Sequence, residues 1–442
     1  MLKLIWVFII PSWSVFFDSN FCLDSECECL TEKTECCNTK TIEDFNHAKV
    51  YELLNRIILS NYFRFYKVNL NRECTFWEDQ KKCVLKNCKV DNCKKEELPP
   101  AFQNNIDEEI CSLQSISFQD VVDTGLTEQQ LKIINKISSD DRSIDFVDIK
   151  DYLEDAEYVD LIKNPERFTG YAGSGSTKVW HSIFQENCLQ LKSTIHKTVS
   201  EGDVFIDPET CAEFKVISRI LSGFRTSVGI HLSSRYPIEN KKFETIWGIN
   251  YDQLFRRFAP ENTNSQGSSW ISDVYFAYSL VHRALLKFKP LLVNLDIQTG
   301  SAEEDKLTKQ LLLTFLQNSP GTFNERIVFT DIKTTPELLD AIKVTFQNIS
   351  RILDCVECEK CRLWGKVQIQ GFATALKILF TPTNGLITRN ISPVVKLNRM
   401  EIISLFNLFS RLSTSLNFLH LWRIHMEQTF TTSTTETSRV DL

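Results

Sequence analysis

The sequence predicts a mainly α-helical fold with a disulfide-stapled N-terminal portion and a flexible cysteine-bearing loop. Apolar residues recur at helical spacing after residue 158, runs that alternate like strands are few, and ten of the fifteen cysteines precede residue 112. We expect helices at Val179–Cys188, Cys211–Leu232, Tyr251–Phe258, Val274–Phe288, Lys306–Leu316, Pro336–Ile352, Trp364–Phe380 and Met400–Ile424. These segments would form a single helical core.

The composition argues against a small domain that depends on disulfides and against a nucleic-acid-binding protein. The chain has 442 residues, of which 43% are hydrophobic, so a large core can form without disulfides. Its net charge of −7 argues against nucleic acid as a partner, because phosphate neutralisation needs a basic surface. The fifteen cysteines therefore need another explanation.

The N-terminus predicts a signal peptide over residues 1–14. Lys3 precedes the apolar run Leu4–Ile10, and small residues follow at Ser12 and Ser14. In the oxidising compartment that this implies, cysteines form disulfides by default. Asn348 and Asn390 begin Asn-x-Ser tripeptides and are candidate glycosylation sites.

We divide the chain by composition. A disulfide-rich portion over residues 15–100 holds the cysteine loop, and an acidic flexible connection over 101–157 carries one short helix at 128–137. The helical core spans 158–426, and a disordered Ser/Thr-rich tail spans 427–442. We also expect a helix over Thr41–Ile58, with Thr41 as its cap. A flexible turn is expected at Gly170–Lys178 and a loop at Asn262–Ser269.

The most informative motif is Cys358-x-x-Cys361, which precedes a helix. Unpaired N–H groups at a helix N-terminus stabilise a thiolate, as disulfide exchange requires. A zinc or iron–sulfur site would need a fourth ligand and a reducing compartment, so we favour a redox disulfide and predict no metal. Cys355, three residues earlier, is better explained by a structural bridge to a distant segment.

Cys83, Cys88 and Cys93 lie in a polar loop. Their spacing fits a stapled loop and an exchanging dithiol equally well. A buried redox pair on a helix needs a mobile dithiol to bring it electrons from protein substrates, which favours the exchanging dithiol. Cysteines alone do not pass electrons to oxygen efficiently, so we expect a cofactor as well. On the helix from residue 213, Ser222, Arg225 and Gly229 share a polar face that spacing alone assigns to solvent.

The residues resemble one known family, the endoplasmic reticulum oxidoreductins, from about Cys27 to Ile424. The segments that carry the resemblance are Tyr62–Leu70, Cys74–Trp77, Glu157–Asp160, Asn164–Tyr171, Glu186–Cys188, Leu221–Gly223 and Asn348–Gly365. The resemblance implies FAD in a helix bundle, an endoplasmic reticulum location, and an enzyme that reoxidises protein disulfide isomerase. It also implies O2 as electron acceptor and hydrogen peroxide as product. A peripheral association with the luminal membrane face is a further expectation.

The resemblance also assigns the cysteines. Cys358–Cys361 would be the active-site disulfide and Cys83–Cys88 the shuttle pair, while regulation would join Cys83 to Cys111 and Cys88 to Cys93. Cys74–Cys355 and Cys188–Cys211 would be structural.

The flavin contacts carry over to Arg167, Thr169, Trp180, Ser222 and Arg257. The chain departs from the family where Arg225 replaces a histidine and Trp270 an arginine. We expect Arg225 to supply the missing charge or Trp270 to stack on the cofactor. The alternative is a catalytically impaired relative, or a non-enzymatic binding protein of the secretory pathway.

Overall fold

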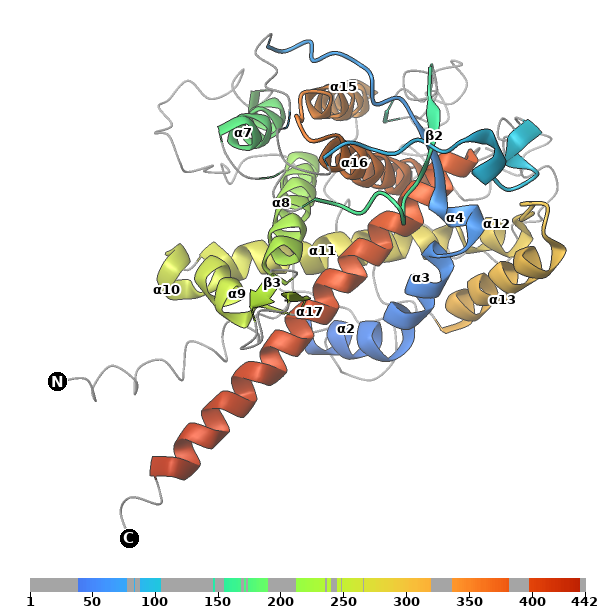
Figure 1. The fold of residues 1–442 in the computed structure, drawn as a ribbon. Helices are drawn as coiled ribbons and strands as arrows, with labels where there is room; N and C mark the ends of the chain where they lie inside the picture. The colour runs from blue at the N-terminus through green and yellow to red at the C-terminus, as the bar shows by residue number, and fades with distance from the viewer. Residues whose placement is uncertain are drawn as a thin grey trace. The chain divides into compact units, whose positions relative to one another are not determined.

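We describe a computed structural model of the chain (Figure 1). It describes residues 39–77, 83, 88–104, 146–147, 155–167, 171, 174–189, 212–234, 237–239, 245–247, 249–264, 266–318, 336–380 and 397–437. The signal peptide, the cysteines before residue 38, the 128–137 helix, Cys111, Thr169, Cys211 and Asn390 lie outside these residues.

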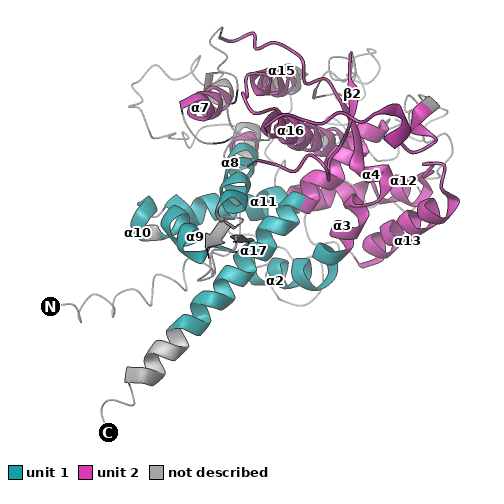
Figure 2. Cartoon of the chain, in the orientation of Figure 1, with its two compact units in different colours: residues 1–52, 219–279, 411–442 teal, residues 53–218, 280–410 magenta. Residues whose placement is uncertain are grey.

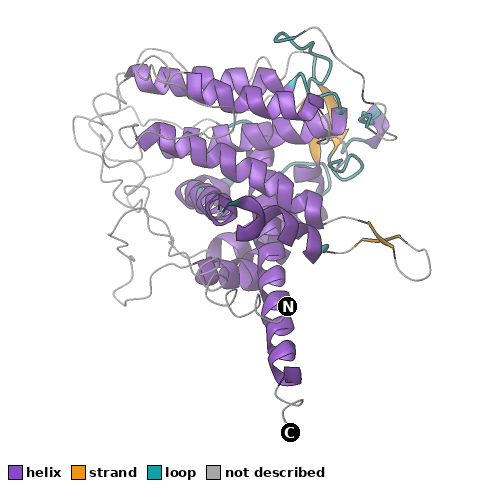
Figure 3. Cartoon of the chain, turned by 90° about the vertical axis from the view of Figure 1, so that its left-hand side faces the viewer, coloured by secondary structure: helices purple, strands orange, loops and turns teal. Residues whose placement is uncertain are grey.

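Helices dominate the described residues, which confirms the predicted mainly α fold (Figure 3). The α-helices are α2 (Thr39–Phe45), α3 (Tyr51–Ile58), α4 (Asn61–Arg64), α7 (Ser174–Leu189), α8 (Ala212–Ser234), α9 (Tyr251–Phe258), α10 (Pro260–Thr263), α11 (Gln266–Lys287), α12 (Lys289–Asn294), α13 (Ala302–Asn318), α15 (Pro336–Leu353), α16 (Glu359–Phe380) and α17 (Arg399–Thr437). A π-helical segment at Asn46–Val50 joins α2 to α3, and 3₁₀ turns lie at Lys95–Glu97 and Phe102–Asn104. No helix in this described part of the chain is both long and apolar enough to cross a bilayer.

Two small antiparallel sheets accompany the helices. β1 (Phe65–Val68) pairs with β2 (Glu157–Asp160), with Phe65 opposite Asp160, and β3 (Pro237–Glu239) pairs with β4 (Thr245–Trp247). The sequence analysis did not predict β1 and β2. Each strand has four residues, too few for alternation to be recognised.

The chain divides into two compact units (Figure 2). Unit 1 comprises residues 1–52, 219–279 and 411–442, and unit 2 comprises residues 53–218 and 280–410. Both are discontinuous in sequence, so they do not follow the boundaries expected from composition, which stay predictions.

Several predicted boundaries were wrong. The expected loop at Asn262–Ser269 holds α10 and the start of α11, because the Thr263 hydroxyl accepts a hydrogen bond from the Gly267 N–H (3.0 Å) and so caps the new helix. Ser174–Lys178 form the first turn of α7 and not a flexible turn, and Thr41 lies inside α2 and is not its cap. α17 continues to Thr437, so much of the expected disordered tail is helical.

In unit 2, α16 packs closely against neighbouring helices. A Cβ atom at Gly371 would lie 2.6 Å from the Ser404 carbonyl oxygen in α17, and one at Gly365 would lie 3.0 Å from the Leu353 side chain in α15. These small residues therefore serve helix packing. A buried ion pair from Lys377 to Glu401 (2.8 Å) joins α16 to α17 again.

In unit 1, a buried carboxylate holds three helices together. Glu43 in α2 is 1% exposed, and it accepts hydrogen bonds from the Tyr275 hydroxyl in α11 and from Arg423 in α17 (Nη2, 2.7 Å; Nε, 2.9 Å). A buried charge that loses its partner destabilises a fold far more than an exposed one.

We therefore expect Glu43→Gln to lower the free energy of unfolding by about 3 kcal/mol, because Arg423 would keep its charge without the carboxylate that balances it. Glu427 offers a matched control, since it pairs with the same arginine while 64% exposed, and Glu427→Gln should cost less than about 1 kcal/mol. Urea unfolding of both variants measures the difference. Equal losses would show that burial does not set the strength of these pairs.

Candidate functional site

Four cysteines from two distant segments meet in unit 2. Cys88, Cys358 and Cys361 form a buried cluster, and Cys83, Tyr171 and Val356 pack against it. The Sγ atoms of Cys83, Cys88 and Cys358 all lie within 4.8 Å of one another. Disulfide exchange needs a thiolate beside a disulfide sulfur, and this arrangement provides it.

The two pairs differ in bonding. Cys83 and Cys88 form a disulfide, whereas Cys358 and Cys361 are thiols. The implied Cys358–Cys361 disulfide is therefore not formed in the structure, although a hydrogen bond joins the two side chains. The resemblance, and not the spacing, singled out Cys83–Cys88 from its alternatives.

The N-terminus of α16 makes the two thiols unequal. Cys358 immediately precedes the helix, and its carbonyl accepts from the Arg362 N–H (2.8 Å). The hydrogen bond with Cys361 lowers the pKa of Cys358 against the effect of burial, and the Lys360 and Cys361 N–H groups and the Arg167 charge lower it further.

Cys361 shows the opposite shift. Its hydrogen bond with Cys358, its burial and the nearby Glu166 carboxylate raise its pKa far above the usual thiol range, and its Sγ lies 3.0 Å from the Arg167 carbonyl oxygen. Cys358 therefore loses its proton more readily than Cys361.

Short-range contacts dock the cysteine loop on α16. The Lys360 N–H donates to the Cys88 carbonyl (3.0 Å), and the Val90 N–H donates to the Glu359 carboxylate (2.9 Å). These two bonds place Cys88 against the helix terminus that carries Cys358.

The same loop is also attached to β2. The Cys93 N–H donates to the Tyr158 carbonyl (2.7 Å), and Asn92 forms a bridge with Val159. Asn164 exchanges two hydrogen bonds with the Asp91 backbone (2.8 and 2.9 Å), while its carbonyl accepts from the Trp364 indole of α16 (2.8 Å).

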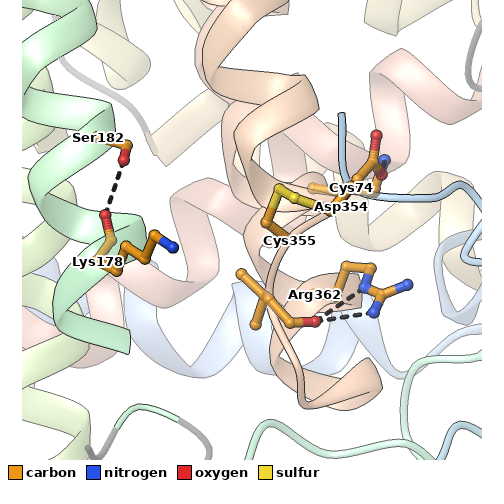
Figure 4. Close-up of a disulfide and its surroundings, with 8 residues drawn as sticks. Cys74, Lys178, Ser182, Asp354, Cys355 and Arg362 are labelled. Atoms are coloured by element: carbon orange, nitrogen blue, oxygen red, sulfur yellow. Dashed lines mark hydrogen bonds and ion pairs between the residues drawn. A yellow bond between two sulfur atoms is a disulfide. The ribbon is translucent and has the colours of Figure 1, made fainter. Parts of the chain in front are cut away.

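A second set of contacts fixes the turn between α15 and α16 (Figure 4). The Cys74–Cys355 disulfide is formed, as the resemblance implied. The partly buried Arg362 guanidinium donates twice to the Val356 carbonyl (2.9 and 3.0 Å) and once to the Leu70 carbonyl (2.6 Å). A buried ion pair between Lys366 and Asp354 (2.5 Å) holds the residue before Cys355.

The sequence analysis missed three of these residues. Glu166 accepts a hydrogen bond from the Tyr171 hydroxyl, and Tyr171 packs against the cysteine cluster. Both belong to the Asn164–Tyr171 segment that supports the resemblance, which was the only sequence signal for them. Arg362 is the third residue, and the sequence did not indicate its contacts with two distant backbone carbonyls.

The implied regulatory pairing is not formed. Cys88 bonds to Cys83, and Cys93 is a half-buried thiol beside Phe65, Leu98, Phe102 and Tyr158. The Cys83–Cys111 bond of the same regulatory pairing stays a prediction, because Cys111 lies outside the described residues. Cys188 lies in α7, but its side chain is outside the described residues, as is Cys211.

Asn348 lies in α15 with its side chain partly buried, and Ser350 of the same tripeptide is buried. Glycosylated asparagines belong to exposed surface segments, so the structure gives this predicted site no support.

The expected flavin residues are divided between the units. Arg167 and Trp180 belong to unit 2, and Ser222, Arg225, Arg257 and Trp270 to unit 1. In unit 1 the polar face of α8 is solvated only in part, since Arg225 is exposed as the spacing predicted while the other two residues have protein contacts. Ser222 hydrogen-bonds to Asp273, and Gly229 is buried beneath Phe258 and Arg257 of α9.

Unit 1 carries positive charge that suits an anionic ligand. Arg225 and Arg257 are both exposed, and neighbouring protein atoms that displace water lower the pKa of each. A Cβ at Gly229, one turn after Arg225, would lie 3.5 Å from the Arg257 Nη1 atom, so the Arg257 guanidinium lies beside the turn of α8 that follows Arg225. Arg219 already neutralises Asp273 (2.8 Å), and within the described residues no carboxylate pairs with Arg257.

Comparison with known proteins decides the family. The profile of the Endoplasmic Reticulum Oxidoreductin 1 (ERO1) family matches residues 49–419. The chain belongs to the ERO1 family.

Relatives and solved structures agree with this family. ERO1-like protein alpha of Homo sapiens is 36% identical over 423 residues, and the Ero1-like protein of Drosophila melanogaster is 35% identical over 427, each with 88% of both chains covered. A cysteine-to-alanine double mutant of S. cerevisiae Ero1p superposes with a TM-score of 0.59 at 26% identity, covering 89% of this chain and 99% of that one. The similarity places this chain among oxidoreductases with the Ero1p helical fold.

The titration of Cys93 is testable by alkylation. Burial, Asp160 and Glu97 raise the pKa of Cys93 to about 11, so its labelling by iodoacetamide should be slow at pH 8 and rise about tenfold per pH unit up to pH 10. Glu97→Gln removes a negative charge and should lower this pKa and speed labelling at pH 8, by less than about tenfold.

Lys163→Gln is the opposite control, because Lys163 lowers the pKa of Cys93 and its loss should slow labelling. Mass spectrometry of the Cys93 peptide gives the rates. Identical rates in all three proteins would contradict this electrostatic account.

Proposed function

We propose that this ERO1-family chain is a thiol oxidase of the endoplasmic reticulum lumen that oxidises protein disulfide isomerase. The observation that supports this most directly is the spacing of the Cys83, Cys88 and Cys358 sulfurs, all within 4.8 Å. A solved structure of Ero1p, described as the source of disulfide bonds for oxidative protein folding in the cell, is 27% identical to this chain with a TM-score of 0.58.

The first exchange takes place at the loop. A thiolate of the partner's dithiol attacks the Cys83–Cys88 bond, and the partner's second thiol resolves the mixed disulfide. The partner leaves as a disulfide, and Cys83 and Cys88 gain its two electrons as thiols. Cys83 suits this encounter because its side chain is only partly buried.

The second exchange takes place inside the cluster. A shuttle thiolate attacks Cys358 of an oxidised Cys358–Cys361 pair, which breaks that bond and releases Cys361, and the other shuttle thiol then displaces Cys358. The products are a Cys83–Cys88 disulfide and two thiols, which is the combination that the structure displays. Cys361 takes up a proton on leaving, and Cys358 leaves as the stabilised thiolate.

The reduced pair needs an electron acceptor. FAD, when bound, would accept both electrons and pass them to O2 as hydrogen peroxide. The cationic face of unit 1 fits the phosphates of such a cofactor, with Arg225 and Arg257 as the residues that would hold them. Arg167, Thr169, Trp180 and Ser222 complete the proposed contacts.

The relay can be tested with single cysteine variants. Cys358→Ala and Cys361→Ala should each reduce oxygen consumption with reduced isomerase to background, because neither variant can form the internal disulfide. Cys361→Ala should also accumulate a mixed disulfide between Cys358 and Cys83 or Cys88, which mass spectrometry of linked peptides detects.

Cys93→Ala is the matched control, since Cys93 lies outside the cluster and its loss should spare oxygen consumption. Normal oxygen consumption without Cys358 or Cys361 would refute the relay.

The flavin assignment can be tested by cofactor content. Arg257→Ala should weaken FAD binding at least about tenfold, the equivalent of one charge-assisted hydrogen bond. Arg256→Ala is the control, because Arg256 is the adjacent and equally exposed arginine of α9, whereas it is the Arg257 guanidinium that lies beside Gly229 of α8. Visible flavin absorbance of the purified proteins reports the loss.

If the unaltered chain carried no flavin, the non-enzymatic alternative would replace this proposal. If Arg257→Ala kept its flavin, the assignment of Arg257 alone would fail.

A further inference from the structure

We propose that reduction of the shuttle disulfide turns the cysteine cluster into a zinc site, and that bound zinc arrests the relay. The site consists of Cys83, Cys88 and Cys358, with Cys361 as the fourth ligand. The metal site follows from geometry alone. The arrest rests on the proposed function.

The spacing of the sulfurs suits a tetrahedral zinc ion. A Zn–S bond of about 2.3 Å places neighbouring sulfurs about 3.8 Å apart. Cys83, Cys88 and Cys358 already lie within 4.8 Å of one another, so small side-chain rotations would be enough once the Cys83–Cys88 bond is broken. The sequence alone provided no such set, because its Cys-x-x-Cys motif lacked further ligands.

Cys361 is available as the remaining ligand. It belongs to the same buried cluster, and its side chain hydrogen-bonds to that of Cys358. Two cysteines at this spacing, joined by two more from a distant segment, form the usual ligand set of a structural zinc site.

The surroundings favour a thiophilic dication. Sulfur ligands select zinc over calcium and magnesium, which prefer oxygen. A zinc ion with four thiolates carries two negative charges, and the cluster lies at the N-terminus of α16, the helix end that favours negative charge. Deep burial of three of the four ligands slows exchange with solvent.

The chemistry balances without an oxidant. A dithiol transfers two electrons to Cys83–Cys88 and becomes a disulfide. Zinc then binds four thiols and releases four protons, with no change in oxidation state. A thiolate bound to zinc is held away from attack on sulfur, so both pairs remain reduced until the metal is removed.

The oxidised protein cannot form this site, because the Cys83–Cys88 disulfide leaves two of the four thiols. Metal binding therefore depends on the redox state of the loop. Zinc would bind the cluster when partner dithiols reduce the Cys83–Cys88 bond faster than the enzyme passes the electrons on.

The test uses the full chain, reduced with a small dithiol and freed of reductant under anaerobic conditions. Zinc and cobalt are the probes. Zinc stoichiometry and affinity are measured by competition with a chromophoric chelator, and cobalt reports thiolate ligation through its sulfur-to-metal charge-transfer absorption. We expect one tightly bound ion per reduced chain, and loss of that ion after reoxidation.

Cys358→Ser and Cys88→Ser should each weaken binding by more than about 100-fold, beyond the loss caused by an outer-shell substitution. Cys93→Ser removes a thiol that lies outside the cluster and should keep full affinity. The Cys74→Ala/Cys355→Ala double variant checks that reduced structural cysteines are not the ligands. Unchanged affinity in Cys358→Ser and Cys88→Ser, or absence of a cobalt–thiolate band, would overturn the site.

The two proposals fail separately. If oxygen consumption is normal and zinc neither binds the cluster nor inhibits, only the zinc inference is wrong. If the chain consumes no oxygen with reduced isomerase, the proposed function is wrong while the cobalt spectrum still decides the site. If zinc binds the cluster but leaves oxygen consumption unchanged, the arrest is refuted.

Discussion

The arrangement of the whole site depends on how the cysteine loop docks on the N-terminus of α16. One backbone hydrogen bond, from the Lys360 N–H to the Cys88 carbonyl, brings a shuttle cysteine to the helix end that carries Cys358. The Val90–Glu359 bond supports it. Each such bond contributes on the order of 1 kcal/mol, so the two together are enough to favour the position of Cys88 beside Cys358.

The helix terminus that receives the loop also sets the direction of the chemistry. N–H groups at the start of α16 favour negative charge on Cys358, while burial and Glu166 keep the proton on Cys361. Arg362 helps to maintain this difference between Cys358 and Cys361, because its three hydrogen bonds to carbonyl oxygens fix the backbone turn that precedes Cys358. Position and electrostatics are thus supplied by the same few residues.

The sequence predicted α9 and α15 to within one residue from their apolar stripes, and it identified Cys358-x-x-Cys361 from local chemistry. The sequence analysis missed the start of α11, which a polar contact of Thr263 determines, and it missed β1 and β2, which are short. Residue spacing could not predict disulfides between distant parts of the chain. Cys74 and Cys355 are 281 residues apart, and only resemblance to a family connected them. Tyr171 and Glu166 were missed for the same reason, since their roles exist only after the chain folds around the cluster.

The Cys74–Cys355 bond has a consequence for biosynthesis. Cys74 emerges during translation with Cys83, Cys88 and Cys93 close behind it, whereas its partner follows only after 281 further residues. During that interval the nearest thiols are the wrong ones. Cys74 must therefore stay reduced, or exchange a temporary partner for Cys355, before the turn that carries Cys358 can be fixed in place.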